Sequence, residues 1–448
     1  MNELVDFEST DRQLNRSLGF GSLLFLSMGA IIGSGWLLGP LDADSLAGPA
    51  SVISWAVGGI LVLLVAFNYA EIAGMLPRSG AIVRYPHLTH GGYTGFILGW
   101  AYLLAAVTVP AIEAEAVLTY AAGQYLKSWH LTASKGGTII LTWPRGILAA
   151  IFLMAVFFVL NYFGVRLTGT LNGIITWWKL IIPSLTFIGL FIWAFHGSNF
   201  TSTASGGFTP LGIKSIFYAI PAGGVIFSYL GFRQALDFGG EAKDPQKDVP
   251  RATIASVLLS AAIFFLLQLA FTGGINWASI GLHPGQWTKL TGANIASSPF
   301  YDLLKATGVG ALGFLGTLLL YDAMISPGGT GYIYNGTAAR TVFGLSVDGY
   351  LPAKTQSLNG RFRVPWIALL AGTVLSCIFF FPAPSWYGFV GFISSATVLT
   401  YVMGGVSLQV LRRTAPDLAR PYRLRGAAVL SPIGFLAATM IVYWSGYS

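Results

Sequence analysis

The sequence predicts an all-α protein that crosses a membrane many times. Of its 448 residues, 54% are hydrophobic and only 9% are charged, whereas a soluble chain carries about 25% charged residues. Apolar runs recur along the whole chain and are long enough to span a bilayer as helices, which takes about 17 to 25 residues. Two of these runs are interrupted by glycine and serine, and such breaks predict a ligand site near the middle of the membrane.

Eleven apolar runs have the composition of membrane spans. They cover residues 18–46, 51–75, 95–125, 147–165, 173–195, 215–238, 254–272, 308–334, 364–381, 387–411 and 427–443. Several are longer than the bilayer requires, so we expect them to tilt, break or protrude.

The spans fall into two similar halves. Each half has five spans and opens with a broken one, and because five is odd the halves insert in opposite orientations, as in the inverted repeats of many secondary transporters. We expect a cytoplasmic N-terminal segment at 1–17, a first repeat at 18–195, an external linker at 196–214 and a second repeat at 215–411. A basic cytoplasmic loop with one additional helix follows at 412–448. Since this layout usually has an even total, we expect a twelfth span that this sequence lacks.

The net charge of +8 does not indicate a nucleic-acid partner, because of how the basic residues are distributed. Of the 25 Lys and Arg residues, 18 are expected on the N-terminal side of the membrane, in loops or, for Arg233, near the inner end of a span; 6 lie on the other side, and Lys179 lies in the middle of a span. The positive-inside rule therefore predicts a cytoplasmic N-terminus in a plasma-membrane protein. The same basic loops are suited to contact anionic membrane lipids.

The first break is the run Gly33, Ser34 and Gly35 inside span 18–46. Opened backbone in a bilayer is costly unless protein or a water-filled cavity lines it. We expect the half-helix that follows, starting near Trp36, to present free N–H groups and the positive end of its dipole, which together suit a carboxylate. The alternative is a glycine hinge that contacts no ligand.

The second break is predicted at Ser228 and Gly231, inside span 215–238. Carbonyl groups freed around Phe227, Ser228 and Tyr229 could accept hydrogen bonds from an ammonium group. The rings of Phe227 and Tyr229 could close over a bound ligand, or they could simply pack in the core.

Ionisable residues within spans are expensive and usually functional. Lys179 lies in the middle of span 173–195, where burial disfavours its charged form, so it is a candidate proton carrier; the alternative is a fixed charge paired with a buried carboxylate. Glu113 and Glu115 diverge by about 200° around a helix, so only one can face a site. Asp322 lies in the middle of span 308–334 and is the second protonatable candidate.

Two further charged residues have alternative interpretations. Arg233 and Asp237 are four residues apart and could form an ion pair on one helix face. If Arg233 is unpaired and faces the break, it would favour an acidic ligand. Glu71 ends the second span at the inner surface, where it could be a gate or loop contact, or a solvated charge.

Enzymatic and metal chemistry have little support. The chain has one cysteine, Cys377, so it can form no internal disulfide or thiol metal cluster. It has no His-Glu-x-x-His pattern, and its five histidines lie in loops or at span ends. We therefore expect no cofactor, no metal and no enzyme activity.

Several segments together resemble the amino acid–polyamine–organocation superfamily of permeases. They follow one another in a specific order and spacing along nearly the whole chain, at 29–35, 70–80, 227–232, 241–251, 340–352 and 420–423.

The resemblance implies a LeuT-like fold of two inverted five-helix repeats, usually with twelve spans. It implies that backbone groups of Gly33–Gly35 hold the carboxylate of an amino acid substrate. Carbonyls near Ile31 and Phe227 would hold its amino group, and Phe227 would be an aromatic gate. Proton-coupled members carry a lysine in the fifth span where sodium-coupled relatives place an ion, and Lys179 looks like that lysine.

The chain departs from the usual pattern at Arg233, a position that is often acidic. This is similar to a subgroup that includes aspartate–proton symporters, and it argues against cationic amino acids and polyamines.

The sequence therefore predicts a proton-coupled amino acid symporter that works by alternating access. The substrate would bind between the first and sixth spans, and spans one, two, six and seven would rock against the rest. The alternatives are an exchanger without proton coupling, an intramembrane enzyme using Asp322 or Glu113, and a channel or receptor. The sequence leaves the oligomeric state open.

Overall fold

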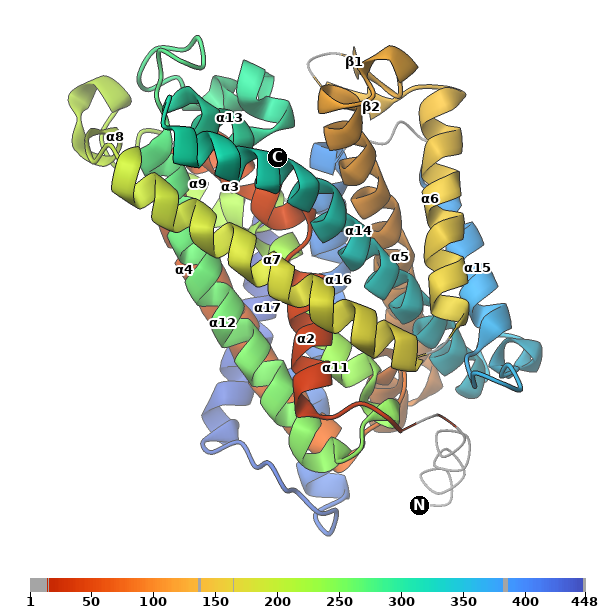
Figure 1. Ribbon diagram of the computed structural model, residues 1–448. Coiled ribbons are helices and arrows are strands. Elements are labelled where there is room, and N and C mark those ends of the chain that lie inside the picture. The colour runs from red at the N-terminus through yellow and green to blue at the C-terminus, as the bar shows by residue number, and fades with distance from the viewer. Residues whose placement is uncertain (1–13, 15, 136–137, 164, 382–385, 446–448) are drawn as a thin grey trace.

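The protein folds into a bundle of tilted helices (Figure 1). The computed structural model describes residue 14 and residues 16–135, 138–163, 165–381 and 386–445, so most of the predicted segment 1–17 lies outside the described residues. The fold class predicted from composition, an all-α multi-pass membrane protein, is confirmed.

The first half of the described chain contains α2 to α9. The helices are α2 (Phe20–Ile31), α3 (Ser34–Ala47), α4 (Ser51–Met75), α5 (Ala81–Gln124), α6 (Arg145–Tyr162), α7 (Val165–Trp193), α8 (Ser198–Thr201) and α9 (Ile213–Ala222). The short 3-10 helices are η1 (Gly48–Ala50), η2 (Lys127–Trp129) and η3 (Thr203–Ser205). The antiparallel strands β1 (Thr132–Lys135) and β2 (Thr138–Leu141) form a hairpin in which Thr132 lies opposite Leu141.

The second half continues from α10 to α17. The helices are α10 (Val225–Tyr229), α11 (Gln234–Asp237), α12 (Pro245–Gly274), α13 (Pro299–Ala306), α14 (Gly310–Val347), α15 (Trp366–Ile378), α16 (Trp386–Thr414) and α17 (Ala427–Ser445). The 3-10 helices are η4 (Leu230–Arg233), η5 (Gly239–Glu241), η6 (Trp287–Gly292), η7 (Asn294–Ser297) and η8 (Ala353–Gln356).

Within the described ranges, eight helical segments are long and apolar enough to cross a membrane, or nine if the bent pair α9 and α10–α11 is one span. One of them, Ser34–Met75, joins α3 to α4 through η1. Two shorter apolar helices, α2 and α15, lie within the predicted spans 18–46 and 364–381. The predicted number of eleven spans stays a prediction.

The helix connections gather at two ends of the bundle. The hairpin β1–β2, α8 and α13 lie at one end, at the top of Figure 1, while α2 begins toward the opposite end and the loop between α16 and α17 lies there too. This grouping agrees with the division of loops from which the orientation was predicted.

Around the breaks, the helices pack closely enough to leave little solvent-accessible surface. Helix α14 runs along α5, and α12 runs along α4 and also contacts α2 and α7. Every residue of α10, η4 and α11 is buried. The two broken segments are therefore enclosed by protein, which is the condition under which broken backbone survives in a membrane.

Candidate functional site

The first break lies where the sequence placed it. Helix α2 ends at Ile31, the backbone is non-helical at Ile32 and Gly33, and α3 starts at Ser34, two residues before the predicted Trp36. Gly33 is needed here because a Cβ atom would lie 2.6 Å from Glu113 Oε1 and 2.7 Å from Thr330 Oγ1. The break is thus a point of close approach between α3, α5 and α14.

The carbonyl end of α2 is satisfied by side chains from other helices. The Nζ group of Lys179 donates to Gly29 O at 2.5 Å and to Thr330 Oγ1 at 2.9 Å. Thr330 Oγ1 donates in turn to Gly29 O at 2.9 Å, and Ser326 Oγ donates to Ile32 O at 2.9 Å. A cation at a helix C-terminus is favoured by the helix dipole, so Lys179 stabilises the opened end of α2.

Lys179 is fully buried but forms no ion pair within 4.0 Å, as far as the described residues show. Its hydrogen bonds go to a backbone carbonyl and a hydroxyl group, while the buried carboxyl groups of Glu113 and Asp322 lie near enough to attract its charge. The interpretation that it is a fixed charge paired with a buried carboxylate stays a prediction.

The N–H end of α3 is capped by a carboxylate of the protein. Ser34 N–H donates to Glu113 Oε2 at 2.9 Å, and Trp386 Nε1 donates to Ser34 Oγ at 2.7 Å. A negative group at a helix N-terminus is stabilised by unpaired N–H groups and by the helix dipole. The N-terminus of α3 thus holds a carboxylate, that of Glu113, and the binding of a substrate carboxylate there stays a prediction.

Asp322 lies on α14, two helical turns before Thr330, and is fully buried. Neither of its carboxyl oxygens has a hydrogen-bond partner among the described residues. The indole groups of Trp36 and Trp178 face it, and the ammonium group of Lys179 lies near enough to attract it. Asp322 is thus linked to the first break through the charge of Lys179.

The second break is present, but it opens earlier than predicted. Helix α9 ends at Ala222, Gly224 has a φ of 75°, and α10 starts at Val225, with a bend of 48° between the two segments. The predicted residues Ser228 and Gly231 lie instead in α10 and η4. The reason is conformational: Gly224 supplies the left-handed backbone that only glycine adopts readily.

This shift changes which carbonyl groups are free. Phe227 O accepts from Leu230 N–H in the turn between α10 and η4, so it is not an open acceptor, contrary to the expectation. The last carbonyls of a helix lack partners within it, and here they belong to the end of α9, where Ala219 O accepts from Gly223 N–H.

Close contacts join the two broken segments. A Cβ atom on Gly35 would lie 2.2 Å from Ser228 Oγ, and one on Gly231 would lie 2.3 Å from Ile31 N. The ring of Phe227 packs edge-on against Trp386 at 5.8 Å. The structure therefore brings Ser228 and Gly231 of the second segment into contact with Gly35 and Ile31 of the first break.

Tyr229 does not join this group. Its hydroxyl donates to Trp55 O at 3.3 Å, and its ring packs edge-on against Trp55 and Phe264, on α4 and α12. Of the two alternatives for Tyr229, core packing is the one that these contacts support.

Arg233 is also buried completely. Asp237 lies near enough to attract its charge, but within the described residues the two form no ion pair within 4.0 Å. None of its guanidinium nitrogens has a hydrogen-bond partner within the described part of the chain. Asp237 instead accepts a hydrogen bond from the Tyr102 hydroxyl at 2.5 Å and one from Ile82 N–H at 3.5 Å. The helical spacing brings the two charges near each other but not into contact, because Arg233 lies in a 3-10 segment and α11 has only four residues.

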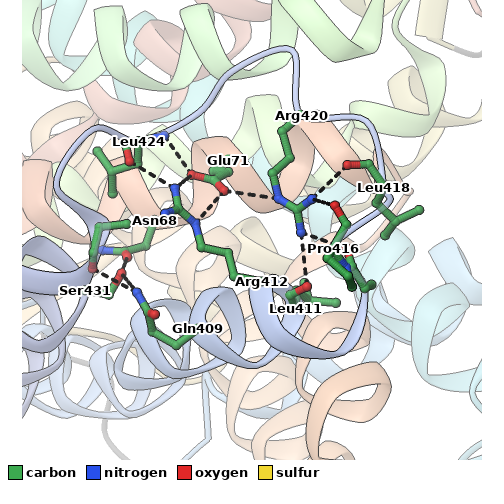
Figure 2. A network of polar contacts seen from close by, with 12 residues as sticks. Asn68, Glu71, Gln409, Leu411, Arg412, Pro416, Leu418, Arg420, Leu424 and Ser431 are labelled. Carbon is green, nitrogen blue, oxygen red and sulfur yellow. Dashed lines mark hydrogen bonds and ion pairs between the residues drawn. The ribbon is translucent and has the colours of Figure 1, made fainter.

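Glu71 is a buried contact and not a solvated charge. Arg412 donates to it from Nε at 2.9 Å and from Nη2 at 2.6 Å, Leu424 N–H donates at 2.7 Å, and Arg420 Nε lies 3.6 Å away. Figure 2 shows how these groups converge on Glu71 from the end of α16 and the loop that follows. This network, which we call the Glu71 clasp, fastens α4 to the segment between α16 and α17.

Sequence reasoning missed the polar residues of α14. Ser326 and Thr330 are four residues apart beside Pro327, and both donate to the opened end of α2. The pattern that could have revealed them is a pair of hydroxyl residues at helical spacing within an apolar run. Trp386, which donates to Ser34, had no pattern that pointed to it.

Comparison with known proteins decides the family. A family model described as an amino acid permease matches residues 18–446, nearly the whole chain. The chain belongs to this family. The resemblance predicted from the sequence is thereby confirmed, and this permease is a multi-pass membrane transporter and not an enzyme.

Two relatives from Bacillus subtilis (strain 168) are similar over almost all of the permease. A glutamate/serine transporter is 37% identical over 441 residues, which is 97% of this chain and 78% of the relative. An aspartate-proton symporter is 33% identical over 446 residues, 98% of this chain and 81% of the relative. A branched-chain amino acid permease from the same organism is more distant, at 26% identity over 457 residues.

Proposed function

We propose that this permease is a proton-coupled amino acid symporter of the plasma membrane that works by alternating access. The observation that carries the proposal is that protein side chains hold both ends of the first break. Glu113 caps the N–H end and Lys179 caps the carbonyl end. These are the backbone groups that an amino acid zwitterion would need for its own carboxylate and ammonium groups.

The substrate carboxylate would take the place of the Glu113 carboxylate at Ser34 N–H. Two carboxylates cannot share one helix N-terminus without strong like-charge repulsion. Protonation of Glu113 removes its charge and weakens its hold on the N–H group, so proton binding and substrate binding favour one another. Such reciprocity is what coupling between two ligands requires.

Lys179 would be the residue that links the proton to the movement of α2. While charged, it ties α2 to α7 through Gly29 O. Once it has lost its proton, that charge-assisted bond is gone and α2 can separate from α7. Asp322 is a further candidate carrier, because an ionised carboxyl without hydrogen-bond partners is costly to bury.

The rest of the proposal concerns architecture. We infer two inverted five-helix repeats at 18–195 and 215–411, a cytoplasmic N-terminus, and rocking of spans one, two, six and seven. The substrate-binding residues would be Ile31, Gly33, Ser34 and Gly35 of the first break, with Phe227, Ser228, Gly231 and Arg233 of the second. The relatives that carry aspartate, or glutamate and serine, suggest small or acidic amino acids as substrates.

The experiment is uptake of radiolabelled amino acids into proteoliposomes, with and without an inward proton gradient. Wild type is compared with Lys179→Ala and with the matched control Lys289→Ala, an exposed lysine in η6. Gradient-driven accumulation that is lost in Lys179→Ala and kept in Lys289→Ala supports the proposal. Uptake that ignores the gradient but rises with internal substrate would mean an exchanger, and would reduce Lys179 to a structural charge.

A further inference from the structure

Arg233 is a buried cation with no hydrogen-bond acceptor. It is 0% exposed, and its Nε, Nη1 and Nη2 atoms all lack a partner in the described chain. The guanidinium Cζ atom lies 4.5 Å from the centre of the Tyr102 ring and 5.1 Å from the centre of the Tyr334 ring. Aromatic faces attract a cation, but they leave its N–H donors unused.

The neighbouring carboxylates accept their hydrogen bonds from other groups, although Asp237 lies near enough to attract the charge of Arg233. Asp237 accepts from Tyr102 and from Ile82 N–H. Glu241, four residues further on, pairs with Arg340 at 2.6 Å. Asp237 attracts the guanidinium without accepting a hydrogen bond from it. Because buried donors are normally hydrogen-bonded, the unused donors of Arg233 point to an acceptor that binds from outside the protein.

Arg233 lies close to the proposed substrate site. Gly231, two residues before it, packs against Ile31 at the end of α2. Tyr334, which covers it, is one helical turn after Thr330, the residue that donates to Gly29 O. Arg233 is thus two residues from a contact with α2, and one of the rings that cover its guanidinium belongs to a residue one helical turn from Thr330.

We propose that Arg233 is the subsite for the side-chain carboxylate of a dicarboxylic amino acid, and hence the residue that selects acidic substrates. The inference rests on the proposed function, in which the first break holds the α-carboxylate and ammonium groups. A carboxylate can accept two parallel N–H bonds from a guanidinium, so it replaces the contact with the Tyr102 and Tyr334 faces by a stronger one. The rings would move aside when the substrate enters.

The test is a competition experiment under counterflow, which needs no proton gradient. Unlabelled aspartate and glutamate compete with a labelled substrate against their amides, asparagine and glutamine, which have the same shape without the charge. Wild type should bind the acids more tightly than the amides. Arg233→Gln should weaken competition by the acids about 10- to 100-fold, the range for loss of a hydrogen bond between charged groups, and leave the amides nearly unchanged.

Two further variants provide a matched control and an independent test of the subsite. Arg251→Gln, an exposed arginine on α12, is the matched control and should behave as wild type. Tyr102→Phe removes the donor that holds Asp237, so Asp237 becomes a competitor for Arg233 and affinity for acids should fall while that for amides stays. It reports on the subsite even if Arg233→Gln does not fold.

Three results would decide against the subsite. They are a wild type that does not distinguish aspartate from asparagine, an Arg233→Gln variant with an unchanged ratio of acid to amide affinity, and an equal loss for both. Failure of proton coupling is a separate result: it abolishes the response to the gradient while the preference for acids in counterflow remains.

Discussion

Removing the carboxylate of Glu71 tests whether the Glu71 clasp stabilises the fold. In Glu71→Ala, Arg412 loses two charge-assisted hydrogen bonds and Leu424 N–H loses its acceptor. Glu71 is 0% exposed, and breaking a buried ion pair by removing one partner costs about 3–5 kcal/mol. The arginines left behind are 23% and 10% exposed, so water can reach them in part. We expect a loss at the lower end, about 3 kcal/mol.

The assay is thermal unfolding in detergent, followed by the fluorescence of the 13 tryptophans. At about 2 °C per kcal/mol, the Glu71→Ala midpoint should fall by about 6 °C. The matched control is Asp244→Ala, which breaks the ion pair of Asp244 with Lys247, where both side chains are more than half exposed. An exposed pair contributes about 0–1 kcal/mol, so this midpoint should hardly move. Equal shifts in the two variants would refute the reasoning.

Two other substitutions test contacts at and above the breaks. Gly231→Ala places a methyl group 2.3 Å from Ile31 N, which is a backbone atom and cannot turn aside. Overpacking of this kind costs about 1–3 kcal/mol, so counterflow should be lost. Retained transport would mean that the two broken segments are not in fixed contact. Asp44→Ala removes the acceptor shared by Ser51, Gln268 and Thr272. The buried donors left unpaired cost about 1–3 kcal/mol each, so the unfolding midpoint should fall as far as that of Glu71→Ala. A midpoint equal to that of wild type would show that the donors find other partners.

The membrane fold class and the position of the first break were determined by the sequence alone. Both are local properties: the length of an apolar run decides whether a helix can span a bilayer, and Gly33 and Gly35 mark where the helix opens. The burial of Lys179 followed in the same way from its place within an apolar run.

The tertiary structure alone decided the contacts between residues far apart in the sequence. Glu113 reaches Ser34 across 79 residues, and Lys179 reaches Gly29 across 150. Neither pairing can be read from spacing along one helix, because it depends on how α5 and α7 pack around the break. The second break moved to Gly224 for a related reason, since several glycines could open the chain and the packing of α9 and α10 selects one. Asp237 likewise accepts its hydrogen bond from Tyr102 on another helix, and not from Arg233 four residues away.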